Sequence, residues 1–322
     1  MRLHKTKPLV GVSSCLLGHE VRFDGGHKRN QIVLGVLNDL FEYRAFCPEL
    51  EAGMRVPRQP IRLLGKDGAV HAVGVRDADF DVTERLKNAS SQYCASIVDA
   101  LSGYIVKKGS PSCGMERVKL YNEDGIPVAK TQGVFTGHLM QENPLLPVEE
   151  EGRLANVTLF KNFLIRVFVY HDWKSLVQAG PLSKHGLIEF HTRHKYLLLS
   201  HNEGIYRKLG KLLAQSGKNN IEEINSEYIA MLMNGLKRLP TRSTHSNVLY
   251  HMAGFFKRSL SRGDKLELVQ VIESYRLGKH ALVAPVTLLM HYLRLNHSAF
   301  LAGQTYLEFQ KLLAQFHAQH DI

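Results

Sequence analysis

The chain has 322 residues, of which 44% are hydrophobic and 22% are charged. These proportions exclude a disordered or low-complexity protein, and the length allows two domains that each bury a core. The net charge is +11 and uneven, because residues 151–322 carry 22 lysines and arginines against 12 acidic residues, while residues 1–150 carry 19 against 18. A basic domain joined to a neutral one is typical of an enzyme that handles nucleic acid, although a solubilising surface explains the charge equally well.

No secretory signal or membrane span is recognisable in the sequence. The first residues lead directly into a predicted strand, and no stretch approaches the roughly 18 to 20 apolar residues that a span requires. We therefore expect a cytoplasmic protein with no membrane partner. In a reducing compartment, clustered cysteines are more often catalytic or metal-binding than paired in disulfides.

The first half of the chain alternates between predicted strands and helices. Strands are expected at residues 8–13, 43–46, 70–75, 104–106 and 118–121, and helices at residues 30–40 and 83–101. This alternation predicts a Rossmann-like, three-layer α/β domain with a mainly parallel sheet. Between these elements, the loop at residues 54–60 contains two arginines among prolines. Such loops near a site often position an anion, although a solvated surface is the commoner explanation.

Three of the four cysteines follow predicted strands. Cys15, Cys47 and Cys113 each stand just beyond a short apolar run, in loops rich in serine, glycine or proline. Because the carboxyl ends of parallel strands are where ligands bind, we expect the three thiols at one site. Three thiolates suit zinc with an open position, or a [4Fe–4S] cluster in which one iron lacks a protein ligand, although their spacing matches no known motif. The fourth, Cys94, lies within a predicted helix and is expected to be a small buried hydrophobe.

The flanks of these cysteines carry four motifs, in order along the chain. They are Ser13-Ser14-Cys15-Leu16-Leu17-Gly18, then Arg22-Phe23-Asp24-Gly25, then Cys47-Pro48-Glu49, then Lys107 followed by Ser110-Pro111-Ser112-Cys113-Gly114. The set resembles the family once known as domain of unknown function 523, whose characterised members are [4Fe–4S]-dependent thiouracil desulfidases. One departure is mild, since Phe23 stands where a tyrosine is common. The second half resembles domain of unknown function 1722, and the fused pair is similar to bacterial desulfidases that remove sulfur from 4-thiouridine in tRNA.

The resemblance implies roles for individual residues. Cys15, Cys47 and Cys113 would hold a [4Fe–4S] cluster whose free iron binds the thiocarbonyl sulfur, so that water replaces sulfur by oxygen without net redox change. Glu49 is the predicted general acid/base, and Ser110 is the second catalytic group, which orients the base or stabilises charge on the ring. Contacts to the nucleobase or to the cluster sulfurs are expected from Ser13, Ser14, Asp24, Lys107 and Ser112, and Ser112 is also the alternative to Ser110.

Two of these residues have ordinary explanations as well. Asp24 stands before two glycines and is a common turn residue, and Lys107 ends a strand whose tip is expected to be solvated.

Residues 144–152 combine prolines, an acidic run and a glycine, which indicates a domain boundary or hinge, although the acidic run would also cap the next helix. We predict a cluster-binding desulfidase domain at residues 1–150, a linker and packing helix at 151–180, and a basic all-α domain at 181–322. The helices of this last domain are expected at residues 187–199, 205–214, 221–237, 248–256, 265–276, 284–293 and 304–317.

The all-α domain is the expected tRNA-binding part of the chain. Its nucleic-acid-binding candidates are basic residues that often stand beside aromatic ones, which would combine phosphate contact with base stacking. They are Arg193, Lys195, Arg207, Lys208, Lys257 and Arg258. Amphipathic helices that only meet water have the same appearance.

Three histidines share a face of one predicted helix. His191, His194 and His201 are separated by three and seven residues, which returns them to the same side. A metal site or a tRNA contact would use this arrangement, but histidines packed and hydrogen-bonded in a helical core are the commoner explanation.

The leading hypothesis is a [4Fe–4S] desulfidase acting on 4-thiouridine in tRNA, with the basic helical domain binding the RNA. An alternative is a desulfidase of free thiouracil or thiouridine nucleotides, in which the helical domain has another task. A third hypothesis, of a different class, is a non-catalytic iron–sulfur sensor that binds nucleic acid. The sequence leaves the oligomeric state and the preferred thiolated position open.

Overall fold

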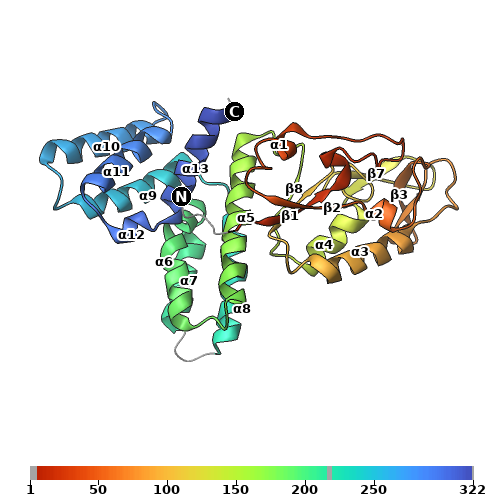
Figure 1. Ribbon diagram of the computed structural model, residues 1–322, viewed down its shortest axis with the longest axis horizontal. Helices are drawn as coiled ribbons and strands as arrows, with labels where there is room; N and C mark the ends of the chain where they lie inside the picture. The colour runs from red at the N-terminus through yellow and green to blue at the C-terminus, as the bar shows by residue number, and fades with distance from the viewer. Residues whose placement is uncertain (1–5, 216–219, 321–322) are drawn as a thin grey trace. The chain divides into compact units, whose positions relative to one another are not determined.

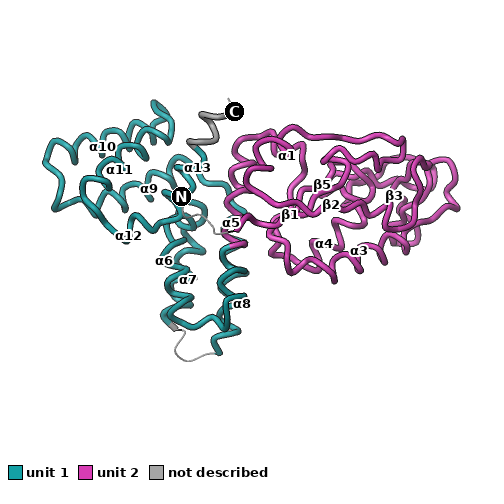
Figure 2. Tube along the Cα trace, in the orientation of Figure 1, with its two compact units in different colours: residues 1–3, 172–322 teal, residues 4–171 magenta. Residues whose placement is uncertain are grey.

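The computed structural model describes residues 6–215 and 220–320. The chain divides into two compact units, residues 4–171 and residues 172–322 (Figure 2). The division falls within the long helix α5 (Val157–Gln178). The domain limits that the sequence predicts, at residues 1–150, 151–180 and 181–322, stay a prediction.

A four-stranded, fully parallel sheet forms the centre of the first unit (Figure 1). Its strands are ordered β2 (Glu42–Phe46), β1 (Leu9–Ser13), β5 (Gly103–Val106) and β8 (Val148–Glu150). The two central strands, β1 and β5, are almost completely buried, as expected for parallel strands covered on both faces. The chain adds β2 on one side of β1 and β5 on the other, so the topological switch point lies between β1 and β5.

Helices cover both faces of this sheet. The helices of the unit are η1 (Ser14–Leu17), α1 (Gln31–Leu34), α2 (Pro48–Glu51), α3 (Thr83–Ile97), α4 (Val134–Glu142) and the first part of α5. On one face α5 packs so closely that a Cβ atom at Gly103 would lie 2.7 Å from Val167. On the other face, Tyr93 of α3 stacks on Phe46, and Phe135 of α4 packs beside both rings. The predicted three-layer α/β fold with a mainly parallel sheet is thus confirmed.

A second four-stranded sheet lies in the same unit. Its order is β4 (Ala69–Gly74), β3 (Ile61–Lys66), β6 (Val118–Tyr121) and β7 (Pro127–Thr131), and only β3 and β6 run parallel. Its core includes Leu63, Ala72, Leu86 and Val118. The strand predicted at residues 70–75 is β4, which lies at an edge of this sheet.

Two sequence-based expectations for this unit were wrong. The helix expected at residues 30–40 begins where Asn30 accepts hydrogen bonds from two backbone amides, but it ends at Leu34 because Gly35 leaves the helical conformation (φ −94°, ψ −104°). Glycine is a weak helix former, so nearby packing decides this turn. The acidic run at 149–151 is also no hinge. Residues 148–150 form the buried strand β8, whose charged side chains have partners within the unit.

Within its described residues, the second unit is built from helices alone, so the predicted all-α domain is confirmed. They are the end of α5, α6 (Lys184–His201), α7 (Glu203–Gln215), α8 (Ile221–Leu236), α9 (Arg242–Ala253), η2 (Gly254–Phe256), α10 (Arg262–Arg276), α11 (Val283–Leu295), α12 (Ala299–Ala302) and α13 (Thr305–His320). Every predicted helix has a counterpart, and only α12 was not foreseen. None of the helices described here combines the length and the apolar character needed to cross a bilayer.

The three histidines of α6 are packed into this unit. His194 and His201 are 2% and 1% exposed, so neither offers a surface for tRNA. The Nδ1 atom of His194 lies 2.9 Å from the carbonyl oxygen of Phe190, and that of His201 lies 2.7 Å from the carbonyl oxygen of Arg238. His191 is half-buried. The arrangement matches histidines hydrogen-bonded in a helical core.

Candidate active site

A cavity of about 230 Å³ opens at the carboxyl ends of β1, β2 and β5, and Cys15, Cys47 and Cys113 all line it. Cys15 and Cys47 follow their strands within two residues, and Cys113 stands in the loop after β5, seven residues beyond Val106. Cys15 lies in η1, which Gly18 ends in the left-handed conformation (φ 95°) that glycine adopts without strain. Cys47 is the N-cap residue of α2. Three loops, far apart in the sequence, thus bring their thiols to one hollow at the switch point of the sheet.

The loop that carries Cys113 is held by several hydrogen bonds. The hydroxyl oxygen of Ser110 accepts from the backbone amides of Ser112 and Cys113, both at 3.2 Å. Thr136 donates its hydroxyl to the carbonyl oxygen of Cys113 at 2.7 Å. Gly133 lies so close that a Cβ atom there would meet the backbone of Ser112 at 2.6 Å. Cys113 therefore has a fixed position at the cavity wall.

The electrostatics of the three thiols reflect their burial and their closeness. Burial raises the pKa of Cys15 to about 11, and the neighbouring Cys47 contributes to the rise. Burial also raises the pKa of Cys47. It raises the pKa of Cys113 well above the ordinary value, and the nearby Cys47 is the second cause of that rise. A bound metal cation reverses this preference and takes the thiols as thiolates.

These three residues could hold a thiolate-ligated metal centre that the cavity accommodates. Across the described parts of the chain, no three histidine, cysteine or acidic side chains are grouped closely enough to hold one single ion. Cys94, by contrast, lies in α3 and is 3% exposed, as expected for a small buried hydrophobe.

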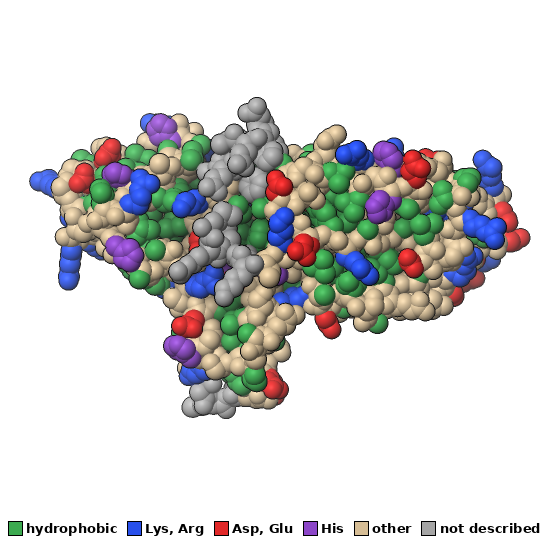
Figure 3. Space-filling view, viewed as in Figure 1, with side chains coloured by type: hydrophobic (Ala, Val, Ile, Leu, Met, Phe, Trp, Pro, Cys, Tyr) green, Lys and Arg blue, Asp and Glu red, His purple; other side chains and the backbone are tan. Residues whose placement is uncertain are grey.

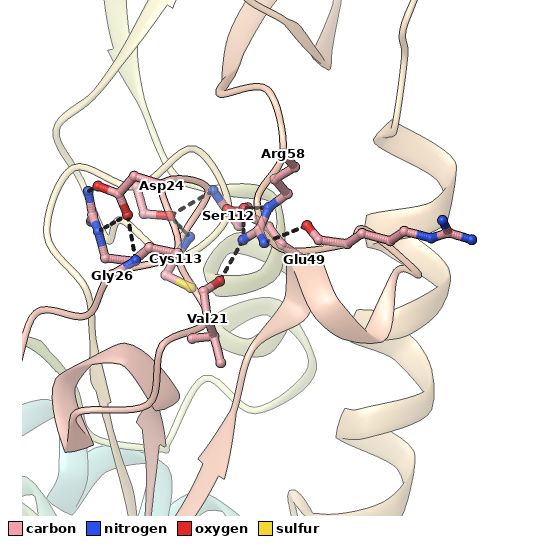
Figure 4. A network of polar contacts seen from close by, with 10 residues as sticks. Val21, Asp24, Gly26, Glu49, Arg58, Ser112 and Cys113 are labelled. Carbon is pink, nitrogen blue, oxygen red and sulfur yellow. Dashed lines mark hydrogen bonds and ion pairs between the residues drawn. The ribbon is translucent and has the colours of Figure 1, made fainter.

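Glu49 lies in the first turn of α2, two residues after Cys47, and lines the same cavity (Figure 4). Its Oε1 atom accepts a hydrogen bond of 2.8 Å from the hydroxyl of Ser112. Its Oε2 atom accepts from Nε and Nη2 of Arg58, at 2.8 Å and 2.5 Å. The carboxylate is therefore held from both sides, and its side chain remains 15% exposed.

The two predicted serines have different positions. Ser110 lines the cavity and stabilises the loop of Cys113 through its hydroxyl oxygen. Ser112 is fully buried, does not line the cavity, and contacts Glu49. Ser112, predicted to contact the nucleobase or cluster, thus lies behind the wall of the cavity. Ser112 makes the contact with Glu49 that was expected of the second catalytic group, for which Ser110 was the first candidate and Ser112 the alternative.

The remaining predicted site residues lie around the rim or behind it. Ser13 and Ser14 line the cavity, and the hydroxyl oxygen of Ser13 accepts from the backbone amide of Lys107 at 3.0 Å. Lys107 also lines it, with its ammonium group 2.5 Å from Oε1 of Glu151. Asp24 does not line it. The carboxylate of Asp24 accepts a hydrogen bond from the backbone amide of Gly26 in a turn and pairs with the guanidinium group of Arg22. Asp24 therefore lies outside the cavity lining, which does not support its predicted contact with the substrate.

The site includes residues that motif reading did not assign. Arg58 lies in the proline-broken loop whose two arginines the sequence analysis noted, but its partner was not predictable from that loop alone. Glu151 was assigned to a hinge, although it orients Lys107. Phe23 lines the cavity, is 37% exposed, and has the guanidinium of Arg22 over its ring at 5.2 Å.

The predicted nucleic-acid-binding residues all lie in the helical unit. Arg193 pairs with Asp172 at 3.3 Å, and Arg207 pairs with Glu203 at 2.6 Å, so part of their charge is already neutralised. Lys208, Lys257 and Arg258 are exposed. On the face seen in Figure 3, lysine, arginine and histidine side chains are spread over the helical unit among hydrophobic ones.

An aromatic pair stands next to these basic residues. Phe255 is 49% exposed and stacks on Phe300, with ring centroids 5.1 Å apart. The ammonium group of Lys195 lies 4.5 Å from the centroid of Phe300. Lys257 and Arg258 follow Phe255 directly in the chain. Aromatic faces and cations therefore occur together at this surface, as the sequence analysis expected.

Comparisons with known proteins match two separate parts of the chain. A family model described as 2-thiouracil desulfurase matches residues 10–151, and one for a protein of unknown function, DUF1722, matches residues 195–310. The YbgA protein of Escherichia coli (strain K12) is 33% identical over 146 residues, which is 45% of this chain and 86% of that protein. YbbK of Bacillus subtilis (strain 168) is 32% identical over 111 residues, 33% of this chain and 73% of YbbK.

Among solved structures, the [4Fe-4S]-dependent thiouracil desulfidase TudS is 28% identical and covers 48% of this chain and 97% of its own, with a TM-score of 0.37. The family resemblance carried by the four sequence motifs of the first half is confirmed by the matching family model. Residues 10–151 of the chain belong to the 2-thiouracil desulfurase family, and residues 195–310 belong to the DUF1722 family.

Proposed function

We propose that this protein is a [4Fe–4S]-dependent desulfidase that converts 4-thiouridine in tRNA to uridine and releases sulfide. The observation that carries the proposal is the meeting of Cys15, Cys47 and Cys113 at one cavity with Glu49 beside them. The donor set fits the cluster, because soft thiolates are the ligands that iron–sulfur clusters take and three of them leave one iron for substrate. The thiols must lose their protons to bind the cluster, and the cationic iron core offsets the burial that raises the pKa of Cys15 and of Cys113.

When bound, the cluster supplies a Lewis-acidic iron for the thiocarbonyl sulfur. The chain itself supplies proton handling and orientation. Oε1 of Glu49 takes a proton from the attacking water, and the same carboxyl group returns it to the departing sulfur, so that C=S and water become C=O and hydrogen sulfide. Ser110 and Lys107 on the cavity wall contact the polar edge of the base. The exposed ring of Phe23 offers a flat heterocycle an apolar face at the mouth.

The tRNA part of the proposal is supported by the second half of the chain. Residues 151–322 hold 22 basic against 12 acidic residues, and Phe255 with its basic neighbours provides a surface for stacking and for phosphate contact. A cytoplasmic location belongs to the same proposal, because tRNA and reduced thiols meet there. Free thiouracil is an equally strong second candidate, because the matching family model is described by that base.

A sulfide-release assay tests the activity and separates the two substrates. We expect the anaerobically reconstituted protein to release sulfide from tRNA that contains 4-thiouridine, at a kcat/KM at least about tenfold above that for free 4-thiouracil or 2-thiouracil. Equal or higher kcat/KM on the free bases would favour the second candidate. Failure to release sulfide from any of these substrates would contradict the enzyme.

The variant Glu49→Gln distinguishes an enzyme from an iron–sulfur sensor. The amide keeps the shape of the side chain but cannot accept the proton of water, so we expect turnover to fall by at least about 100-fold. The visible absorbance of the cluster and the binding of tRNA should be unchanged. Turnover close to that of the unmodified protein would remove Glu49 from the mechanism.

A further inference from the structure

We infer that Arg58 is a positioning residue for Glu49. It holds the Glu49 carboxylate in the orientation in which one lone pair of Oε1 accepts the proton of water. The inference rests on the proposed desulfidase function, which it deepens. It concerns a residue that none of the four sequence motifs of the first half contains.

Both carboxylate oxygens of Glu49 have defined partners, as Figure 4 shows. Nε and Nη2 of Arg58 converge on the Oε2 atom, and the hydroxyl of Ser112 reaches Oε1. An ionised carboxylate has about four lone-pair sites. Arg58 occupies the two on Oε2 and Ser112 occupies one on Oε1. The remaining site, on Oε1, is the one that a water molecule in the cavity can reach.

The guanidinium group of Arg58 is itself held in place. Its Nη2 atom donates to the carbonyl oxygen of Val21 at 2.8 Å, and its Nη1 atom donates to that of Arg55 at 3.2 Å. The backbone amide of Arg58 donates to the carbonyl oxygen of Phe23 at 2.9 Å. The side chain is 7% exposed. Arg58 thus joins Glu49 to the segment that carries Val21 and Phe23, two residues that line the cavity.

The geometry requires arginine. A planar guanidinium group presents several donors in fixed directions, whereas the ammonium group of a lysine is a single point of charge on a flexible stem. A lysine at position 58 would keep the charge near Glu49 but could not occupy Oε2 twice while also bonding to Val21. A glutamine would lose the charge as well. The two substitutions therefore separate charge from geometry.

The experiment compares Arg58→Lys and Arg58→Gln with the unmodified protein after anaerobic cluster reconstitution, using the better of the thiolated substrates. We expect kcat to fall about 10-fold in Arg58→Lys and about 100-fold in Arg58→Gln, with KM within twofold and full cluster absorbance. The matched control is Arg55→Gln, a change to an exposed side chain of the same loop, and its kcat should be unchanged.

A role in stability alone would lower the yield of folded, cluster-bearing protein without changing kcat per cluster. If kcat per cluster of Arg58→Gln stays within threefold of the unmodified value, or if only KM changes, the inference is overturned. The double variant gives a further test. A residue that acts through Glu49 should have little effect on kcat once Glu49 has been replaced, so the inference is also overturned if adding Arg58→Gln lowers kcat by the same factor in Glu49→Gln as in the unmodified protein.

A second measurement does not depend on activity. In cluster-free protein, urea unfolding of Arg58→Gln, Glu49→Gln and the double variant forms a thermodynamic cycle. Replacing either Arg58 or Glu49 alone would leave the other as a largely buried group without its ionic partner. We therefore expect a coupling of at least about tenfold in the unfolding equilibrium constant. Independent effects would overturn the inference even if no thiolated uracil proves to be a substrate. A strong coupling together with an inactive protein would refute only the proposed function.

Discussion

At the level of single residues, the four cysteines differ in what surrounds them. Cys15, Cys47 and Cys113 line the cavity at the strand ends, whereas Cys94 lies on the buried face of α3. A thiol in an apolar interior behaves as a small hydrophobic group, and a thiol at an open cavity is available for metal. The position of a cysteine relative to the strand ends thus decides which chemistry it supports.

Replacing Cys47 by alanine removes one of the three thiols at the cavity, so we expect loss of the cluster and of sulfide release. Cys94→Ala is the control, and it should keep both while lowering the free energy of unfolding by about 1 kcal/mol, because a buried sulfur is lost. Iron content, visible absorbance and released sulfide are the measurements. A Cys47→Ala protein that retains its cluster would contradict the proposed ligand set.

At the level of elements, the two central strands approach each other closely beside the site. Gly11 of β1 lies next to the fully buried ring of Tyr104 in β5, and a Cβ atom at Gly11 would lie 2.2 Å from that ring. Contacts of this length do not occur, so the ring or the strand would have to move. The close approach explains why glycine occupies this position in an otherwise apolar strand.

We expect Gly11→Ala to lower the free energy of unfolding by about 1–3 kcal/mol, as overpacked cores do. The matched control is Gly65→Ala in β3, where the added carbon would meet Leu120 at 3.5 Å, an ordinary contact. That variant should unfold within about 0.5 kcal/mol of the unmodified protein. Urea unfolding followed by circular dichroism measures both. Equal stability of the two variants would contradict the packing argument.

Helix α6 gives the helical unit a dependence on pH through His191. Burial first, then Lys195 and His194, lower the pKa of this ring to about 4, and its Nδ1 atom lies 3.1 Å from the hydroxyl oxygen of Tyr228. The folded chain therefore keeps the ring neutral at pH values where the unfolded chain binds a proton. The contribution to stability is complete above pH ~6.5 and is lost as the pH falls toward 4.

Between pH 7 and pH 5, this linkage should lower the free energy of unfolding by about 1–2 kcal/mol, and the loss should shrink in His191→Gln. Trp173, the one tryptophan of the chain, stacks near Tyr228 at 5.9 Å between ring centroids, so its fluorescence reports on this unit. His185→Gln, at an exposed position of α6, is the control and should keep the full dependence. An unchanged dependence in His191→Gln would contradict the argument.

At the level of the whole molecule, the uneven charge links the helical unit to the choice of substrate. A free base needs only the cavity, whereas tRNA needs phosphate contacts over a wide surface, and these make affinity depend on salt. The exposed residues Lys257 and Arg258, which closely follow Phe255 in the chain, are the strongest candidates for such contacts.

If the tRNA proposal holds, replacing Lys257 and Arg258 together by alanine should weaken tRNA binding about 10-fold or more and lower the slope of log affinity against log salt by about 2. The kcat/KM for free thiouracil should stay the same. The control is Lys87→Ala in α3, a lysine already paired with Glu84 at 2.8 Å, which should alter neither quantity. An unchanged salt slope in the double variant would argue against these contacts.

Local signals in the sequence determined most of the elements. Capping residues such as Ser183, Asn220, Thr241 and Ser261 start helices near the predicted positions, because a short polar side chain satisfies the first free amides wherever the chain turns into a helix. Among the strands, β1, β2, β4, β5 and β6 were predicted, whereas β3, β7 and β8 were not. At α1 the apolar spacing was correct but Gly35 ended the helix, which periodicity alone does not register.

Sequence patterns were enough to predict the fold class and to point to the three cysteines and Glu49, which line one cavity, since each of these depends on neighbours within a few positions or on a motif. The roles of these residues stay a prediction. The contacts within the site, by contrast, became visible only in the folded chain. Ser112 and Glu49 are 63 residues apart, and their hydrogen bond depends on β1, β2 and β5 placing their carboxyl ends together. Arg58 and Glu151 found their partners in the same way. Side chains distant in sequence meet only when strand order and register are set, and these follow from the packing of the whole unit.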